Sequence, residues 1–152
     1  MSTMDMVNVY LYTTIKGPRK RAGAFTYILE METAKGPATL SKTEYRKEAT
    51  ENQAELQALI AALKRLKKPC ALSIYTDSEY LAGALERGWI AEWKAKDWKN
   101  AKRQPIAHMS EWQETAELLN AHRFQCLVGS RHSYYTWMQQ EAKKKLEENK
   151  DV

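Results

Sequence analysis

The chain has no long apolar run and few of the residues that mark unusual protein classes. No stretch approaches the roughly 20 consecutive apolar residues that a membrane-spanning helix needs, and residues 1–5 (MSTMD) lack the basic and apolar regions of a signal peptide. Six Gly and four Pro among 152 residues, with 43% hydrophobic residues, do not fit collagen-like or disordered proteins. The sequence therefore predicts a globular, cytoplasmic protein without a membrane partner.

Cysteine is also scarce, and its placement argues against a disulfide scaffold and a zinc site. Cys70 and Cys126 lie in apolar, strand-like runs, and neither has CxxC or Cys/His ligand spacing around it. A chain of this length buries roughly 68–70% of its unfolded surface and needs no covalent cross-link. We expect two buried free thiols.

Basic residues outnumber acidic ones, and most of the excess lies in one segment. The formal net charge is +5, and residues 87–103 hold six Lys or Arg against two acidic residues. This pattern favours a polyanionic partner such as nucleic acid; the alternatives are a solvated face for the cations and core packing for the tryptophans. The candidate nucleic-acid contacts in this segment are Trp89, Trp93, Lys94, Lys96, Trp98, Lys99, Lys102 and Arg103.

Hydrophobic periodicity predicts one α/β domain over residues 1–152, with a core at 7–142 and a charged helix end at 143–152. Short connections between the first three strands predict an antiparallel meander, and the helix–strand order that follows predicts parallel pairing. The predicted strands are 7–13, 24–31, 39–45, 71–76 and 124–128. Two predicted helices follow the caps Thr50 and Ser78, and two more begin at about residue 109 and at residue 134.

Two carboxylates fall where active-site acids would stand. Glu55 follows a capping-box start, Thr50-x-x-Gln53, and shares a helix face with apolar residues, so it should point inward. Asp77 ends a buried strand, the place where open α/β sheets bind ligands. The alternative for each is an ordinary acid at a helix N-terminus.

The motifs around both acids resemble those of the ribonuclease H family. Residues 50–56 (TENQAEL) look like the family's Thr-x-Asn-x-x-Glu-Leu helix start, residues 76–78 look like its Thr-Asp-Ser strand end, and the Trp-containing basic segment resembles a protrusion of some members. The likeness is nearly continuous over residues 50–112. It implies a ribonuclease H-like fold, a five-stranded mixed sheet flanked by helices, with Asn52 among the nucleic-acid contacts.

The resemblance also implies a reaction, hydrolysis of the RNA strand of an RNA/DNA hybrid by two Mg²⁺ ions that four acids hold. Glu55 and Asp77 match two of these catalytic, metal-binding acids. The first strand offers only Thr13 or Thr14 at the third place, and neither carries a charge.

The last helix offers three residues for the position of the fourth acid. Helix phase puts Gln139 at the site and an ungapped count puts Gln140 there, while Glu141 is a weaker metal-ligand candidate that requires a shorter loop. The family's loop histidine could be His132, or it could be absent, since Ser130 takes the ungapped position.

Three functions follow from this incomplete set of acids. The leading hypothesis is a nucleic-acid-binding domain for RNA/DNA hybrid or a related duplex, in which Mg²⁺ or Mn²⁺ is weakly held and cleavage is weak or lost. The first alternative is an active hybrid endoribonuclease that uses Glu55, Asp77 and Glu141. The second is a protein-interaction module that retains only the fold.

Overall fold

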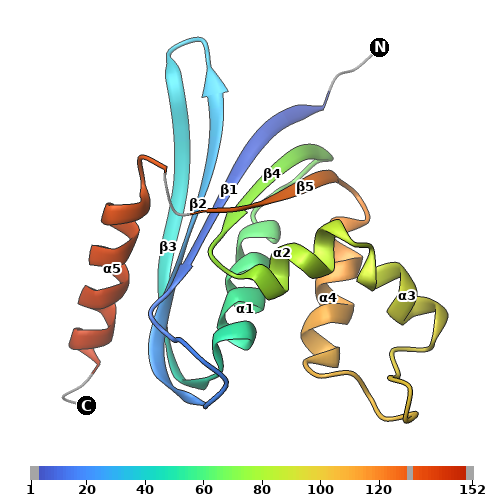
Figure 1. The fold of residues 1–152 in the computed structure, drawn as a ribbon. Coiled ribbons are helices and arrows are strands. Elements are labelled where there is room, and N and C mark those ends of the chain that lie inside the picture. Colours follow the sequence, from blue (N-terminus) through green and yellow to red (C-terminus); the bar gives the residue numbers. More distant parts are fainter. Residues whose placement is uncertain (1–3, 130–131, 150–152) are drawn as a thin grey trace.

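Five strands form one mixed sheet with helices on both faces (Figure 1). The computed structural model describes residues 4–129 and 132–149. Its elements are β1 (Asp5–Thr13), β2 (Arg21–Thr33), β3 (Gly36–Ala49), α1 (Glu51–Leu63), β4 (Cys70–Thr76), α2 (Glu79–Glu86), α3 (Trp89–Ala95), α4 (Met109–Leu119), β5 (Arg123–Val128) and α5 (Tyr135–Glu148).

The strand order is β3-β2-β1-β4-β5, so β1 lies at the centre of the sheet. The pairs β1–β2 and β2–β3 are antiparallel, whereas β1–β4 and β4–β5 are parallel. The predicted five-stranded mixed sheet is confirmed. The second and third strands are longer than predicted, because they pair as far as a two-residue turn between Thr33 and Gly36.

The main core lies between the sheet and α1. Residues Leu56, Leu59 and Leu63 of α1 are each at most 2% exposed and pack against the strands. The Thr50 hydroxyl accepts a hydrogen bond from the Gln53 N–H at 3.1 Å, which confirms the predicted cap. The Gln53 side chain does not complete a capping box, since it donates to Glu111 of α4.

The terminal helix α5 covers the opposite face over β1, β2 and β3 (Figure 1). Met138 is fully buried there against Tyr10 and Ile28. The Tyr134 hydroxyl donates to Glu30 of β2, which ties the start of α5 to the sheet. Glu30 pairs with Asn8 of β1, so this bond holds the start of α5 over the middle of the sheet.

Other predictions concern the cysteines and the membrane. Cys70 and Cys126 are both buried and free, as expected. Within residues 4–129 and 132–149, no helix combines the length and apolarity that crossing a membrane requires.

Candidate functional site

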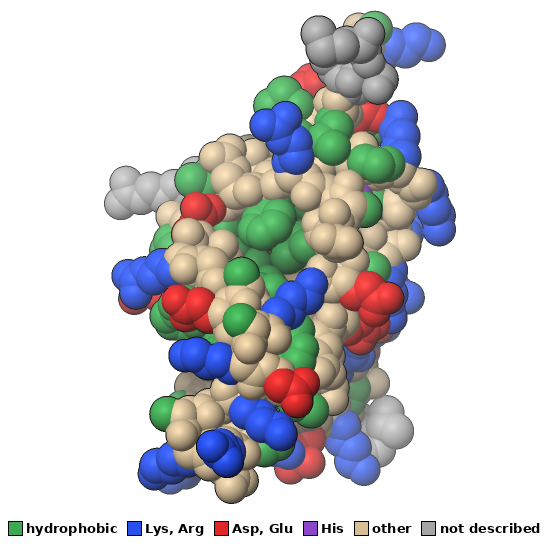
Figure 2. Space-filling view, turned by 90° about the vertical axis from the view of Figure 1, so that its right-hand side faces the viewer, with side chains coloured by type: hydrophobic (Ala, Val, Ile, Leu, Met, Phe, Trp, Pro, Cys, Tyr) green, Lys and Arg blue, Asp and Glu red, His purple; other side chains and the backbone are tan. Residues whose placement is uncertain are grey.

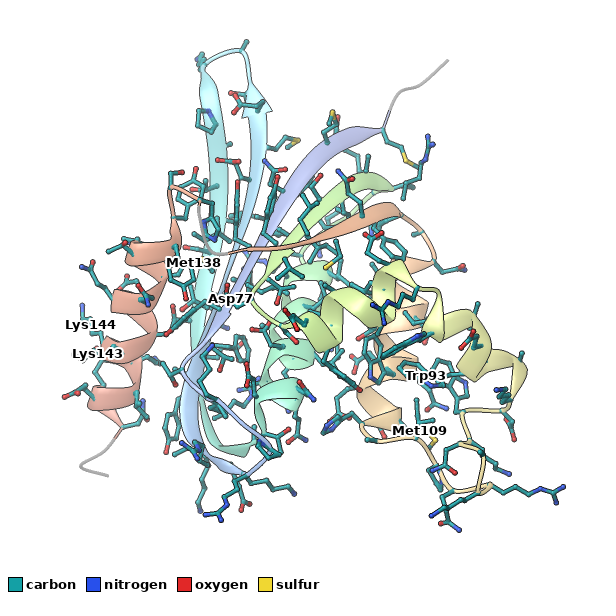
Figure 3. The ribbon with its side chains drawn as sticks, viewed as in Figure 1. Asp77, Trp93, Met109, Met138, Lys143 and Lys144 are labelled. Atoms are coloured by element: carbon teal, nitrogen blue, oxygen red, sulfur yellow. The ribbon has the colours of Figure 1, made fainter. Side chains whose placement is uncertain are left out.

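Glu55 and Asp77 meet at the carboxyl end of β4. Asp77 directly follows the strand, and the hydroxyl of the preceding Thr76 donates to Glu55 Oε2 at 2.8 Å. Glu55 projects from α1 into the core and is 2% exposed, as the helix pattern predicted. Figure 3 shows Asp77 at the bend of the chain that follows β4. The structure thus brings both predicted acids to one edge of the sheet.

The environment of Glu55 favours its protonated form. Burial raises the pKa of Glu55 to about 7, and the negative charges of Asp77 and Glu51 add to the rise. The hydrogen bond from Thr76 and the positive charge of Lys16 lower the pKa and so oppose the effect of burial. At neutral pH the carboxyl group therefore carries a proton for a large part of the time, and a cation that binds there has to displace that proton.

Tyr12, rather than Thr13 or Thr14, stands beside Asp77 on the first strand. Tyr10 pairs with Tyr75 in the parallel ladder, so two residues further Tyr12 and Asp77 lie on the same face. Tyr12 is thus a further candidate for the family's first-strand position, beside the predicted Thr13 and Thr14. Both threonine hydroxyls are engaged elsewhere: that of Thr13 donates to the Ala24 carbonyl, and that of Thr14 accepts from the Ala24 N–H.

Tyr135 of α5 contacts both Asp77 and Tyr12. Its hydroxyl donates to Asp77 Oδ2 at 2.8 Å, and its ring lies edge-on to Tyr12 with 5.5 Å between centroids. Gln139 and Gln140 are both exposed, one turn further along the helix. The spacing of Tyr135 from the buried Met138 and Ala142 was the available sequence signal for an inward-facing residue.

Further aromatic rings extend the site along the sheet. His132 lies 4.4 Å from the Tyr10 ring centroid and 5.8 Å from that of Tyr135, and burial lowers its pKa. Tyr10 also stacks on Tyr75 at 4.9 Å. His132 therefore lies beside Tyr135, and the negative charge of Asp77 acts on it. It stays the candidate for the loop histidine, and Ser130 lies outside the described residues.

The donor set does not fit a two-metal centre. Glu141, the third predicted ligand, lines a groove of about 320 Å³ between α5 and β3 together with Trp137 and Lys144. Within residues 4–129 and 132–149, no group of three or more His, Cys, Asp or Glu side chains is arranged to hold a metal ion. Two acids remain, and each already accepts a hydrogen bond from a hydroxyl.

The tryptophans of the basic segment anchor it to the core. Trp93 lies 5.0 Å from Trp112 and 6.0 Å from Trp89, and all three predicted tryptophans are half-buried. Figure 3 shows Trp93 between α3 and α4. Core packing thus accounts for much of the tryptophan pattern, and direct contact of these rings with nucleic acid stays a prediction.

The cations of the same segment are exposed. Lys94, Lys96, Lys99, Lys102 and Arg103 all face solvent. The Asn100 side chain accepts hydrogen bonds from the N–H groups of Lys102 and Gln104, which orders the loop that carries them. Figure 2 shows this side of the molecule, with Lys and Arg side chains at its lower end. The predicted Asn52 is half-buried beside Glu51, in a small hollow at the start of α1.

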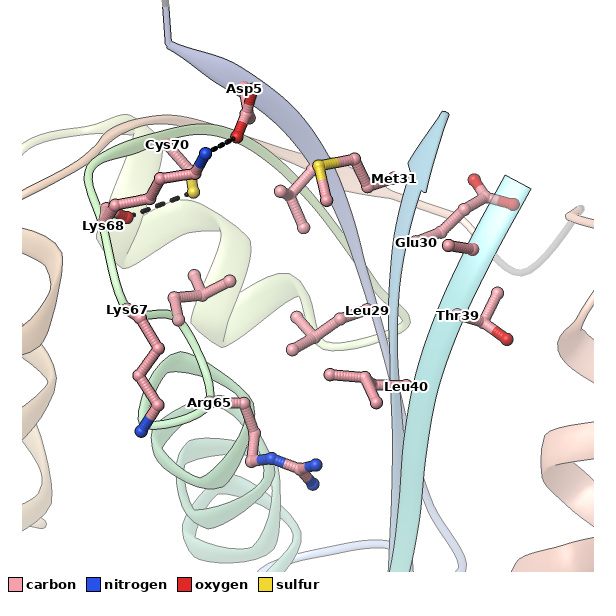
Figure 4. A pocket seen from close by; sticks show the side chains of 13 residues that line it. Asp5, Leu29, Glu30, Met31, Thr39, Leu40, Arg65, Lys67, Lys68 and Cys70 are labelled. Atoms are coloured by element: carbon pink, nitrogen blue, oxygen red, sulfur yellow. Dashed lines mark hydrogen bonds and ion pairs between the residues drawn. The ribbon is translucent and has the colours of Figure 1, made fainter. Parts of the chain in front are cut away.

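A separate apolar cavity of about 520 Å³ lies at the other end of the sheet (Figure 4). Leu29, Leu40 and Leu66 are among its walls, and the Lys68 ammonium at its rim pairs with Asp5 at 2.6 Å. Asp5 begins β1, whereas Glu55 and Asp77 lie at the end where β1 and β4 finish. This cavity is therefore distinct from the acid site.

Solved structures with the same topology define the class of fold. LC9-RNase H1, a type 1 RNase H with the type 2 active-site motif, gives a TM-score of 0.78 at 18% identity, covering 97% of this chain and 75% of that one. A foamy viral protease-reverse transcriptase in complex with RNA/DNA hybrid gives 0.68 at 17% identity, covering 93% and 20%. The predicted ribonuclease H-like fold is confirmed.

The family follows from the sequence match. The RNase H family model matches residues 7–146, so the chain belongs to the RNase H family. It is 37% identical to a ribonuclease H of Caldicellulosiruptor saccharolyticus over 78 residues. The aligned stretch covers 51% of this chain and 54% of that protein. The chain spans about half the length of the curated relatives it matches.

We expect Glu55 to make stability depend on pH. Its pKa is about 7 in the folded chain against 4.5 as the ordinary value, so its contribution is fully present below 4.5 and is lost as pH rises through 7. The difference between the two pKa values corresponds to about 3 kcal/mol in the free energy of unfolding. As pH rises through 7, urea denaturation should show wild type losing about 3 kcal/mol of stability relative to Glu55→Gln, because the Gln amide stands in for the neutral carboxyl and does not titrate.

The matched control is Glu79→Gln, which removes an exposed carboxyl group near the same edge. It should leave the pH dependence of the wild type unchanged. Parallel stability curves for wild type and Glu55→Gln would contradict the assigned environment of Glu55.

Proposed function

We propose that this chain is an RNase H-family domain that binds RNA/DNA hybrid or a related duplex and cleaves it weakly or not at all. The observation that carries the proposal is the pair of tyrosines at the sheet edge. Tyr12 and Tyr135 stand beside Glu55 and Asp77, where the family resemblance leads us to expect two further acids.

The chemistry of these side chains disfavours metal-dependent hydrolysis. Mg²⁺ and Mn²⁺ prefer carboxylate and water oxygens, and a two-metal clamp needs several anionic ligands. Burial and the bond to Asp77 raise the pKa of Tyr135 above the ordinary value of 10, so its phenol stays neutral. A divalent ion at Glu55 and Asp77 would therefore be weakly held.

Several observations support nucleic acid as the partner. The chain carries a net charge of +5, and the exposed cations of residues 94–103 lie on an ordered segment. Such cations bind phosphates in a sequence-independent, salt-dependent way. A relative of the same fold was solved with RNA/DNA hybrid, which makes the hybrid the first ligand to test.

Restoring acids should restore cleavage. Wild type and Asp77→Asn should leave an end-labelled RNA/DNA hybrid equally intact in Mg²⁺ and Mn²⁺, whereas the double variant Tyr12→Asp/Tyr135→Asp should gain Mn²⁺-dependent cleavage. The control Thr14→Asp/Tyr135→Asp should gain none, because the Thr14 side chain is directed to Ala24. Strong wild-type cleavage that Asp77→Asn abolishes would instead support the active nuclease that uses Glu55, Asp77 and Glu141.

The basic segment should supply much of the affinity. Replacing Lys94, Lys96, Lys99 and Lys102 with Gln should weaken hybrid binding and reduce the salt slope, log Kd against log salt, by up to about 4. Fluorescence anisotropy measures both quantities.

The control replaces Lys143, Lys144 and Lys145 on α5 with Gln, which also removes clustered positive charge. It should change the affinity less. A wild-type protein without any salt-sensitive affinity for a duplex would support the interaction-module alternative.

A further inference from the structure

Lys16 lies at the mouth of the acid site, outside the basic segment. Its Nζ atom is 4.0 Å from Glu51 Oε2 and 5.2 Å from the centroid of the Tyr12 ring. Its positive charge also acts on the buried Glu55. The Lys16 side chain is nevertheless 49% exposed, so the ammonium group faces the acids and solvent at the same time.

The loop that carries Lys16 is fixed to the start of α1. The Gly17 N–H donates to Glu51 Oε1 at 2.8 Å, and the Glu51 N–H donates to the Gly17 carbonyl at 3.1 Å. Gly17 has a φ of 87°, a conformation that favours glycine. These two bonds hold the connection between β1 and β2 against the helix and thereby set the position of Lys16.

Each acid around Lys16 has a hydrogen-bond donor of its own. The Gly17 N–H donates to Glu51, the Thr76 hydroxyl donates to Glu55, and the Tyr135 hydroxyl donates to Asp77. The distance from Lys16 to Glu51 is at the outer limit of an ion pair. The ammonium group therefore keeps donors for a ligand, while the acids are partly satisfied.

We propose that Lys16 binds a backbone phosphate of the nucleic acid directly, at the edge where the family resemblance leads us to expect a divalent ion. This inference rests on the proposed hybrid binding. A lysine ammonium is a compact charge with three donors, which suits phosphate oxygens. Arg19 and Lys20 are exposed on the same loop and extend the cationic surface. Binding at this edge then requires no divalent cation.

The test is fluorescence anisotropy of a labelled RNA/DNA hybrid, titrated with the 152-residue chain in EDTA and again in Mg²⁺. Lys16→Gln should lose several-fold in affinity and lower the salt slope by about 1 in both solutions. Lys16→Arg should retain most of the wild-type affinity. Lys35→Gln is the matched control, because it removes an exposed lysine from the hairpin turn at the opposite end of the sheet.

Three results would overturn the proposal. Equal affinities and slopes for Lys16→Gln and Lys35→Gln would show that Lys16 touches no phosphate, and hybrid binding itself would still stand. A requirement for Mg²⁺ in the wild type would show that a metal ion performs this role. Absence of any hybrid binding by the wild type would overturn the proposed function as well. Matching melting curves of the variants establish that each is folded.

Discussion

The parallel pairing of β1 with β4 is the constraint on which the site depends. Because the two strands run side by side from Asp5 and Cys70, they finish at the same edge of the sheet. That edge receives Tyr12 from β1 and Asp77 from β4, while α1 packs Glu55 against Thr76. These three elements, which the core holds in place, carry Tyr12, Asp77 and Glu55, and α5 adds Tyr135.

The hydroxyl groups at this edge supply hydrogen bonds to both acids. An ionised carboxylate in an apolar interior is costly unless it accepts hydrogen bonds. Tyr135 and Thr76 donate to Asp77 and Glu55, and Lys16 adds a positive charge nearby. The network consists of neutral donors and one ammonium group, and the proposed phosphate binding rests on this composition.

Local signals made most of the fold predictable, and long-range contacts did not. The Thr50 cap, the apolar stripe of α1 and the inward direction of Glu55 depend on neighbouring residues. The position of Tyr12 depends on strand register, where a shift of one residue exchanges the two faces. Without an acid near the carboxyl end of that strand, no residue marked the correct phase. The helix spacing marks Tyr135 as inward-facing, but its contact with Asp77 spans 58 residues and no local pattern identifies that partner.

The central claim is that this edge of the sheet binds phosphate through Lys16 and does not hold a divalent ion. The most direct test is paramagnetic broadening of backbone amide signals as Mn²⁺ is added to the ¹⁵N-labelled protein. We predict no saturable broadening centred on Glu55 and Asp77. Saturable broadening at those residues with micromolar Mn²⁺, lost in Asp77→Asn, would contradict it.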